Sequence, residues 1–284
     1  MGNAVFIVWR ETLEAVLIVS ILYSFLIRQK QTEAAQKGRR FLWLGVGAGI
    51  ALSLVLAALI IRVQEGLVGR ALDYFQTLIL FISAALMTQM VFWMSKHGRV
   101  MKKSLESELS EALQDRGMWS VAAVAGLAVA REGAETVVYF YGIAFETGMG
   151  SKPGMLLAAL IGLGLALLSA WIISKGIRFL NYQTFFKVTG ILLLLSAAGL
   201  ISAGTNKLIE LEVLPSLINP LWDTSVLLDS STRPGGLLAS FTGYRSKPSA
   251  MLVIVYSGFW IFSSLSMLRM KRSHHFKPAA QVFA

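Results

Sequence analysis

The chain has 284 residues, of which 55% are hydrophobic and only 15% are charged, whereas an ordinary soluble domain carries roughly 25% charged residues. Together with a mean hydropathy of +0.64, this composition indicates an integral membrane protein and excludes a soluble one with a single anchor. The net charge of +10 does not indicate nucleic-acid binding, because the basic residues stand beside long apolar segments, and the absence of cysteine excludes thiolate ligands and disulfides.

Seven apolar segments are long enough to cross a bilayer, since a membrane helix needs about 20 residues. The first is too long and too charged for a cleavable signal peptide. The sequence therefore predicts an all-α integral membrane protein with one transmembrane domain over residues 1–284. The seven predicted membrane helices cover residues 4–27, 40–62, 71–95, 118–143, 154–174, 184–207 and 250–268.

The segments between these helices give the expected orientation. If the N-terminus lies outside, most Lys and Arg residues fall on the inner side, as positive charge does in membrane proteins. We therefore expect a multi-pass protein of the inner (plasma) membrane with its N-terminus outside and its C-terminus in the cytoplasm. On the inner side, Leu105, Leu109 and Leu113 recur at helical spacing and predict a short amphipathic helix. The outer segment 209–249 is rich in Pro and Gly, and one short helix is expected at 237–241.

The first and fourth predicted helices carry the same charged motif, R-E-x-x-E. It occurs as Arg10-Glu11-x-x-Glu14 and as Arg131-Glu132-x-x-Glu135. A charged side chain within a membrane span costs about 2.5–3.5 kcal/mol on insertion scales, so such residues are interpreted as functional. Residues three and four apart share a helix face. We therefore predict that the four glutamates form one cation site, with the two arginines as their charge partners.

The two motifs also indicate an internal repeat. A weaker Ser-Ala-Ala echo follows two helices after each motif, at 83–85 and 196–198. Repeats of three helices have opposite orientations in the membrane, and inverted repeats around a midplane site are a transporter architecture. We predict an inverted 3+3 repeat, with repeat 1 at about residues 1–97 and repeat 2 at about 118–208. The helix at 250–268 lies outside it.

Other residues of the predicted helices are expected to serve packing or anchoring. Small residues let helices approach closely in lipid, which lacks a hydrophobic drive for helix pairing. Met90 is expected to pack in the core, and Tyr139 to anchor the membrane interface. The glycines expected at close helix contacts are Gly45, Gly47, Gly49, Gly162 and Gly164.

The composition of the motifs favours a hard metal ion. Oxygen ligands suit hard cations, and no histidine lies in a predicted span, which disfavours an imidazole-rich zinc or copper site. A pair of Arg and Glu can also staple a helix without any ligand, but this accounts poorly for two copies. Outside the spans, Asp73 and Asp223 are the better candidates for an access path that concentrates cations, against ordinary solvated loop charge as the alternative.

The motifs resemble the R-E-x-x-E motifs of the oxidase-dependent, high-affinity iron permeases of fungi and bacteria, and most of all their bacterial members. The resemblance extends over nearly the whole chain and includes segments 90–94, 197–200 and 243–244. It implies iron as the transported substrate, no cofactor, the motif glutamates as ligands, and an extracytoplasmic iron oxidase or iron-delivery protein as partner. This sequence departs from the family in having few acidic residues at the outer start of the third helix, where Asp73 is followed by the neutral Gln76.

We therefore expect a transporter rather than an enzyme, namely a high-affinity iron permease surrounded by membrane lipid. Two alternatives stay open. One is a permease for another metal, such as Mn²⁺ or Pb²⁺, on the same scaffold. The other is an intramembrane metal-dependent enzyme with paired carboxylates, although no H-E-x-x-H or G-x-S-x-G motif is present. The motifs do not distinguish Fe²⁺ from Fe³⁺.

Overall fold

The computed structural model describes residues 2–28, 33–97, 101–115, 118–146, 152–174, 182–230 and 232–275. Within these residues all regular secondary structure is helical, as predicted. The helices are α1 (Gly2–Arg28), α2 (Glu33–Gly66), α3 (Arg70–His97), α4 (Met101–Asp115), α5 (Met118–Glu146), α6 (Lys152–Ser174), α7 (Tyr182–Glu210), α8 (Arg233–Thr242) and α9 (Ala250–His275).

Each predicted membrane segment lies within one long helix, which extends beyond the apolar residues by a few polar ones. Among the described helices, α2, α3, α6, α7 and α9 are long and apolar enough to cross a membrane with at most two charged residues in the apolar stretch. Helices α1 and α5 have the length, but each contains the three charged residues of its motif. The sequence feature that marks the candidate site thus separates these two helices from the other five.

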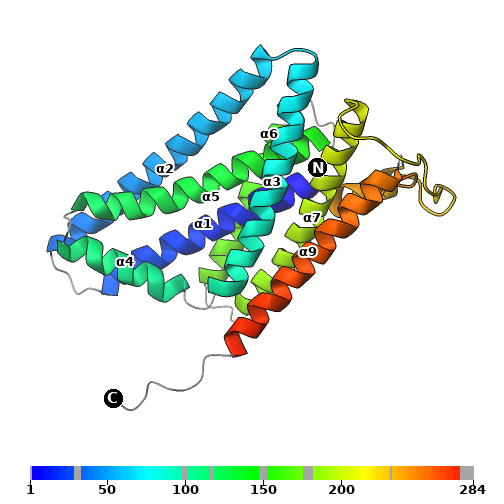
Figure 1. Ribbon diagram of the computed structural model, residues 1–284. Helices are drawn as coiled ribbons and strands as arrows, with labels where there is room; N and C mark the ends of the chain where they lie inside the picture. The colour runs from blue at the N-terminus through cyan, green and yellow to red at the C-terminus, as the bar shows by residue number, and fades with distance from the viewer. Residues whose placement is uncertain are drawn as a thin grey trace.

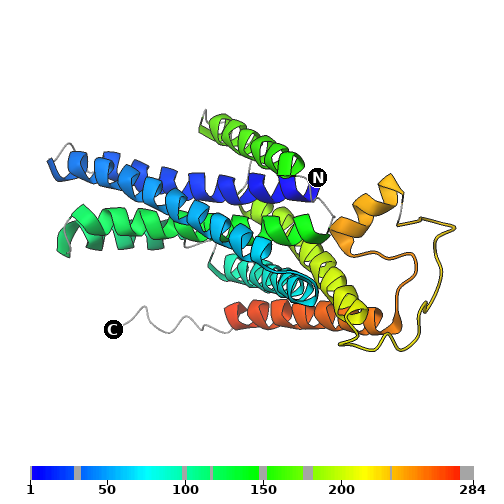
Figure 2. The ribbon, with the colours of Figure 1, turned by 90° about the horizontal axis from the view of Figure 1, so that it is seen from above.

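Helices α1 and α5 lie side by side in the middle of the bundle and run in opposite directions (Figures 1 and 2). Helix α2 packs against α5, α6 packs against α1, and α3 packs against α7. Apolar side chains such as Leu54, Leu160 and Ile261 are exposed on α2, α6 and α9. An outward apolar surface of this kind fits a lipid environment.

The buried residues form separate clusters around the two central helices. One cluster joins α1, α3, α5, α6 and α7 and includes Ile7, Met87 and Tyr139. A second joins α1, α2, α4 and α5. Methionine 90 is also buried, as its predicted packing role requires. The apolar core therefore surrounds the charged motifs on both sides along the bundle.

The predicted amphipathic helix is confirmed as α4. Its Leu109 is fully buried and packs in one cluster with Leu22, Leu26 and Leu42. The side chain of Leu113, the third residue of the predicted apolar stripe, lies outside the described residues. Buried apolar contacts therefore fix α4 across the ends of α1, α2 and α5.

The segment after α7 is irregular apart from α8, which contains the short helix predicted at 237–241. Thr232 caps α8 by accepting a hydrogen bond from the amide of Gly235, at 3.2 Å. Gly243 ends the helix in the left-handed conformation, at φ 71°. The cap residues thus set the helix bounds that the apolar pattern alone placed too narrowly.

Candidate metal site

The charged residues of the α1 motif are almost completely buried. The Arg10 guanidinium contacts both glutamates of its own motif: Nη1 donates to Glu11 Oε1, and Nη2 lies 2.5 Å from Glu14 Oε1. Such charge-assisted contacts compensate for the removal of both ions from water. Glu11 Oε2 has no hydrogen-bond partner among the described residues, so it is a carboxylate oxygen available for a ligand.

The α5 motif has the same residue types in a different arrangement. Arg131 Nε donates to Glu135 Oε1 at 3.1 Å and lies 3.9 Å from Glu132 Oε1. Tyr139 donates its hydroxyl hydrogen to Glu135 Oε2 at 2.9 Å. Glu135 therefore has a partner for each oxygen, whereas Glu132 Oε2 is buried and has no hydrogen-bond partner in the described part of the chain.

Residues of α3 hold Arg131 in place. Its Cζ lies 4.6 Å from the centre of the Trp93 ring, a cation–π distance. Its Nη2 lies 3.5 Å from Met90 Sδ. The Arg131 side chain remains 44% exposed, whereas that of Arg10 is 2% exposed. The two arginines of the repeated motif therefore occupy different environments.

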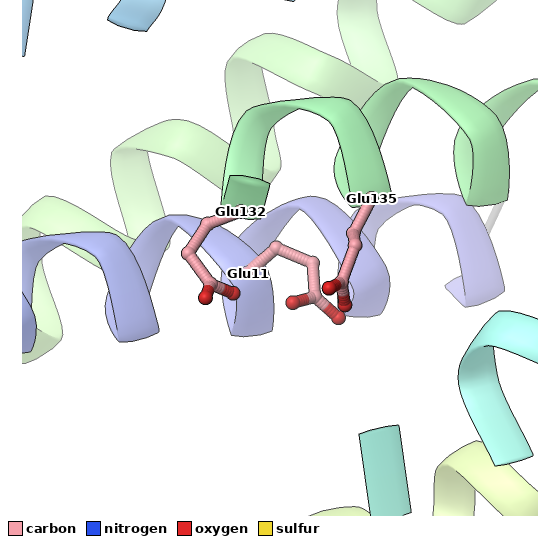
Figure 3. A group of neighbouring side chains, drawn as sticks. All are labelled: Glu11, Glu132 and Glu135. Atoms are coloured by element: carbon pink, nitrogen blue, oxygen red, sulfur yellow. The ribbon is translucent and has the colours of Figure 1, made fainter. Parts of the chain in front are cut away.

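The structure brings three of the four motif glutamates together. Glu11, Glu132 and Glu135 each offer a carboxylate oxygen within 4.8 Å of the other two. Figure 3 shows the three carboxylates pointing to the same side of the two helices, one from α1 and two from α5. Hard cations take oxygen ligands at about 2.0–2.6 Å, so small side-chain movements would bring these oxygens onto one ion. Glu14 is outside this group and pairs with Arg10 instead.

Glycines allow α2 and α6 to pack closely against the two helices that carry the motifs, α5 and α1. A Cβ added to Gly45 of α2 would lie 2.2 Å from the carbonyl oxygen of Ala122 in α5. A Cβ added to Gly162 of α6 would lie 2.8 Å from the carbonyl oxygen of Val5 in α1. The atoms around Gly45 are backbone atoms of α5, and at Gly162 the side-chain Cβ of Val8 lies nearer still, at 2.7 Å, so neither position has room for a side chain. The predicted packing role therefore fits these glycines, but Gly47 and Gly164 have open space around them.

Two partners of the site do not follow from the charged motif alone. Tyr139 is fully buried against Glu135, so the interfacial anchor predicted from its place near the end of a span is wrong. Its position four residues after Glu135 is the signal that could have identified the contact. Trp93 lies on another helix, and no spacing rule links it to Arg131.

The candidate access residues each have a cationic partner. Asp73 lies 2.7 Å from Lys207, joining the start of α3 to the end of α7. Asp223 lies 3.0 Å from Lys247. The pKa of Asp223 is lowered to about 2, because the hydroxyl and amide of Ser225 donate to it and Lys247 stands beside it. Neither aspartate belongs to the carboxylate group of the motifs.

The chain is similar in sequence to iron permeases. A model of the iron permease FTR1 family matches residues 1–269. The ferrous iron permease EfeU of Escherichia coli O6:H1 (strain CFT073) is 33% identical over 255 residues, which cover 88% of this chain and 89% of that protein. The ferrous iron permease EfeU of Yersinia pestis is 32% identical over 252 residues, which cover 88% of this chain and 87% of that protein. No solved structure matches the chain.

Proposed function

Because the chain belongs to the FTR1 iron permease family, we propose that it moves iron ions across the membrane through the paired glutamates of α1 and α5. A member of this family is a transporter rather than an enzyme. The observation that carries the proposal is the meeting of carboxylate oxygens from two oppositely running helices within 4.8 Å. Iron is the cargo of this site and not a resident cofactor.

The proposed binding step is an exchange of positive charge. Glu11 Oε2 and Glu132 Oε2 lack hydrogen-bond partners among the described residues and are the first ligand atoms available to an arriving ion. Glu135 joins them when the ion replaces the contact between Arg131 Nε and Glu135 Oε1, which measures 3.1 Å. Arg131 is half exposed, so its charge can turn toward water when the ion displaces it. Glu14 stays with Arg10 and keeps that buried arginine compensated.

We also propose that α1, α2, α3, α5, α6, α7 and α9 are seven membrane spans built on an inverted repeat. The packing supports this, because α2 contacts α5 while its repeat equivalent α6 contacts α1. A glycine makes a close contact in both pairs. Helices α1 and α5 can span the membrane despite their charges because most of these charges are buried and Arg131 is paired with Glu135 beside a cavity.

The orientation and the partners are further parts of the proposal. Helix α1 begins on the side of the bundle opposite to the end of α9, as an odd number of spans requires (Figure 1). With the excess of Lys and Arg, this supports an N-terminus outside and a C-terminus in the cytoplasm of the inner membrane. Asp73 and Asp223 would then lie on the outer access path, where an iron oxidase or iron-delivery protein would supply the ion.

Uptake by purified protein in liposomes tests the proposed function. Wild-type protein should accumulate radioactive iron, and presenting Fe²⁺ and Fe³⁺ separately identifies the species that is carried. Glu14→Ala and Glu135→Ala should abolish iron accumulation. Glu14→Ala removes a charge partner of the buried Arg10, and Glu135→Ala removes a proposed ligand of the ion. Both variants must first be shown to insert at wild-type levels. Normal uptake by both would contradict the proposal, and stronger competition by Mn²⁺ or Pb²⁺ than by iron would favour the alternative substrate.

A further inference from the structure

A cavity of about 370 Å³ connects the motif residues with α4. Glu14, Arg131 and Glu132 line it at the motifs, and Ser104 and Glu108 line it on α4. Trp93 and Met94 of α3 form part of its wall. It therefore joins a buried charged site to a helix that is not one of the apolar spans.

The cavity has polar groups at both ends. Glu132 is 97% withdrawn from solvent, and its Oε2 has no hydrogen-bond partner among the described residues. On α4, Ser104 Oγ donates to Glu108 Oε1 at 3.3 Å, and both residues are exposed. A cation that leaves the buried carboxylates thus meets one further carboxylate, which is already open to water.

Buried apolar side chains hold helix α4 against the bundle, at one end of this cavity. Leu109, one residue after Glu108, is fully buried, and Leu105 packs against the same cluster while lining the cavity. Helix α4 contacts both α1 and α5 near the end of one and the start of the other. By the charge bias of the sequence this is the inner side of the membrane.

We propose that this cavity is the release path of the transported cation and that Glu108 is the acceptor carboxylate at its inner mouth. This inference rests on the proposed function. The ion passes from the carboxylates of Glu11, Glu132 and Glu135 along Glu132 into the cavity and then to Glu108. Arg131 lines the same cavity, and its contact with Glu135 re-forms once the ion has left Glu135, which reduces the repulsion between the guanidinium and the leaving cation.

Paired substitutions on α4 give the first test. Glu108→Gln keeps the shape and removes the charge, and Glu111→Gln is the matched control, since Glu111 is exposed on the same helix and does not line the cavity. Maximal Fe²⁺ uptake into liposomes should fall on the order of tenfold in Glu108→Gln. A factor of this order is what the attraction between one carboxylate and a nearby dication contributes in a near-aqueous medium. Glu111→Gln should stay within about twofold of wild type, as surface substitutions do. Equal uptake by the two variants would overturn the proposal.

The lack of cysteine in the chain allows a second test that does not need transport. In a Ser104→Cys variant, the single thiol should react with a cationic thiol reagent, and Fe²⁺ under reducing conditions should slow this reaction. Adding Glu132→Gln should remove the protection by Fe²⁺. A thiol that is unreactive, or reactive at the same rate with and without Fe²⁺, would show that the cavity is not an ion path.

The two tests separate the failure of this inference from failure of the proposed function. If wild-type protein takes up iron and Glu108→Gln does so equally well, only the release path is wrong. If wild-type protein takes up no iron, the proposed function is wrong, and protection of the Ser104→Cys thiol by Fe²⁺ still decides whether cations reach this cavity.

Discussion

Neutralising Glu132 should stabilise the iron-free protein against unfolding and should abolish iron binding. The side chain of Glu132 is 4% exposed, its nearest cationic atom is Arg131 Nε at 3.9 Å, and two other carboxylates have an oxygen within 4.8 Å. Its charge is therefore poorly compensated by the described residues around it. Glu132→Gln keeps the shape of the side chain and removes this charge.

The magnitude follows from the distances. At an effective dielectric constant of about 20, two like charges 4.8 Å apart repel by about 3.5 kcal/mol, and opposite charges 3.9 Å apart attract by about 4 kcal/mol. Glu132 thus has two repulsions against one attraction, and water screens that attraction because Arg131 is 44% exposed. Arg10 offsets part of the repulsion from Glu11. We expect a net gain of about 1–2 kcal/mol, which corresponds to a rise of roughly 2–6 °C in the unfolding midpoint.

Thermal unfolding of the purified protein, with and without Fe²⁺, measures both effects. The matched control is Glu135→Gln, because Glu135 has an arginine at 3.1 Å and a tyrosine hydroxyl at 2.9 Å, and its neutralisation should not raise the midpoint. Iron at 100 times its dissociation constant should stabilise wild type by about 2.7 kcal/mol and neither variant. If Glu132→Gln lowered the midpoint of the empty protein as much as Glu135→Gln, or kept the full shift with iron, Glu132 would not be an uncompensated ligand.

Two further substitutions test the role of Arg10 as a charge partner and the close packing of α2 against α5. Arg10→Lys should reduce iron uptake at least about tenfold, because one ammonium lacks the planar fork that contacts Glu11 and Glu14 together; uptake at the wild-type rate would show that the fork is dispensable. Gly45→Ala should destabilise the protein by about 1–3 kcal/mol, because its Cβ would overlap the backbone of α5. Gly47→Ala is the control, since nothing lies within 4 Å of its Cβ, and equal unfolding midpoints for the two variants would argue against a close contact between α2 and α5.

The helices could be predicted from the sequence because they depend on short-range patterns. The meeting of the two motifs could be inferred because charged residues inside apolar spans need partners, and the same motif occurs in two spans. Apolar runs define the long helices, and the spacing of Glu132 and Glu135 places them on one helix face. The separation of Glu14 from the other three carboxylates could not be predicted, because it depends on which oxygens Arg10 reaches. The same holds for the pair of Asp73 and Lys207, which joins residues 134 positions apart.

A single sequence also does not tell which face of an apolar helix meets a neighbour. Gly45 and Gly47 look equivalent in the sequence, but only Gly45 contacts α5. Arg10 and Arg131 look equivalent too, but Arg10 is buried beside its own glutamates, whereas Arg131 is partly exposed and contacts Trp93 and Met90 of α3. Such choices follow from tertiary packing, which overrides local pattern.

Arg10 and Arg131 have unequal surroundings although they belong to motifs with the same R-E-x-x-E pattern. Arg10 is buried beside its own glutamates, whereas Arg131 lies over the Trp93 ring and lines the cavity. On the function that we propose, an ion bound between the two motifs would have different chemical groups on its α1 and α5 sides. In the inverted repeat that we propose, the direction of transport would then come from the residues that surround each motif and not from the sequence that the two copies share.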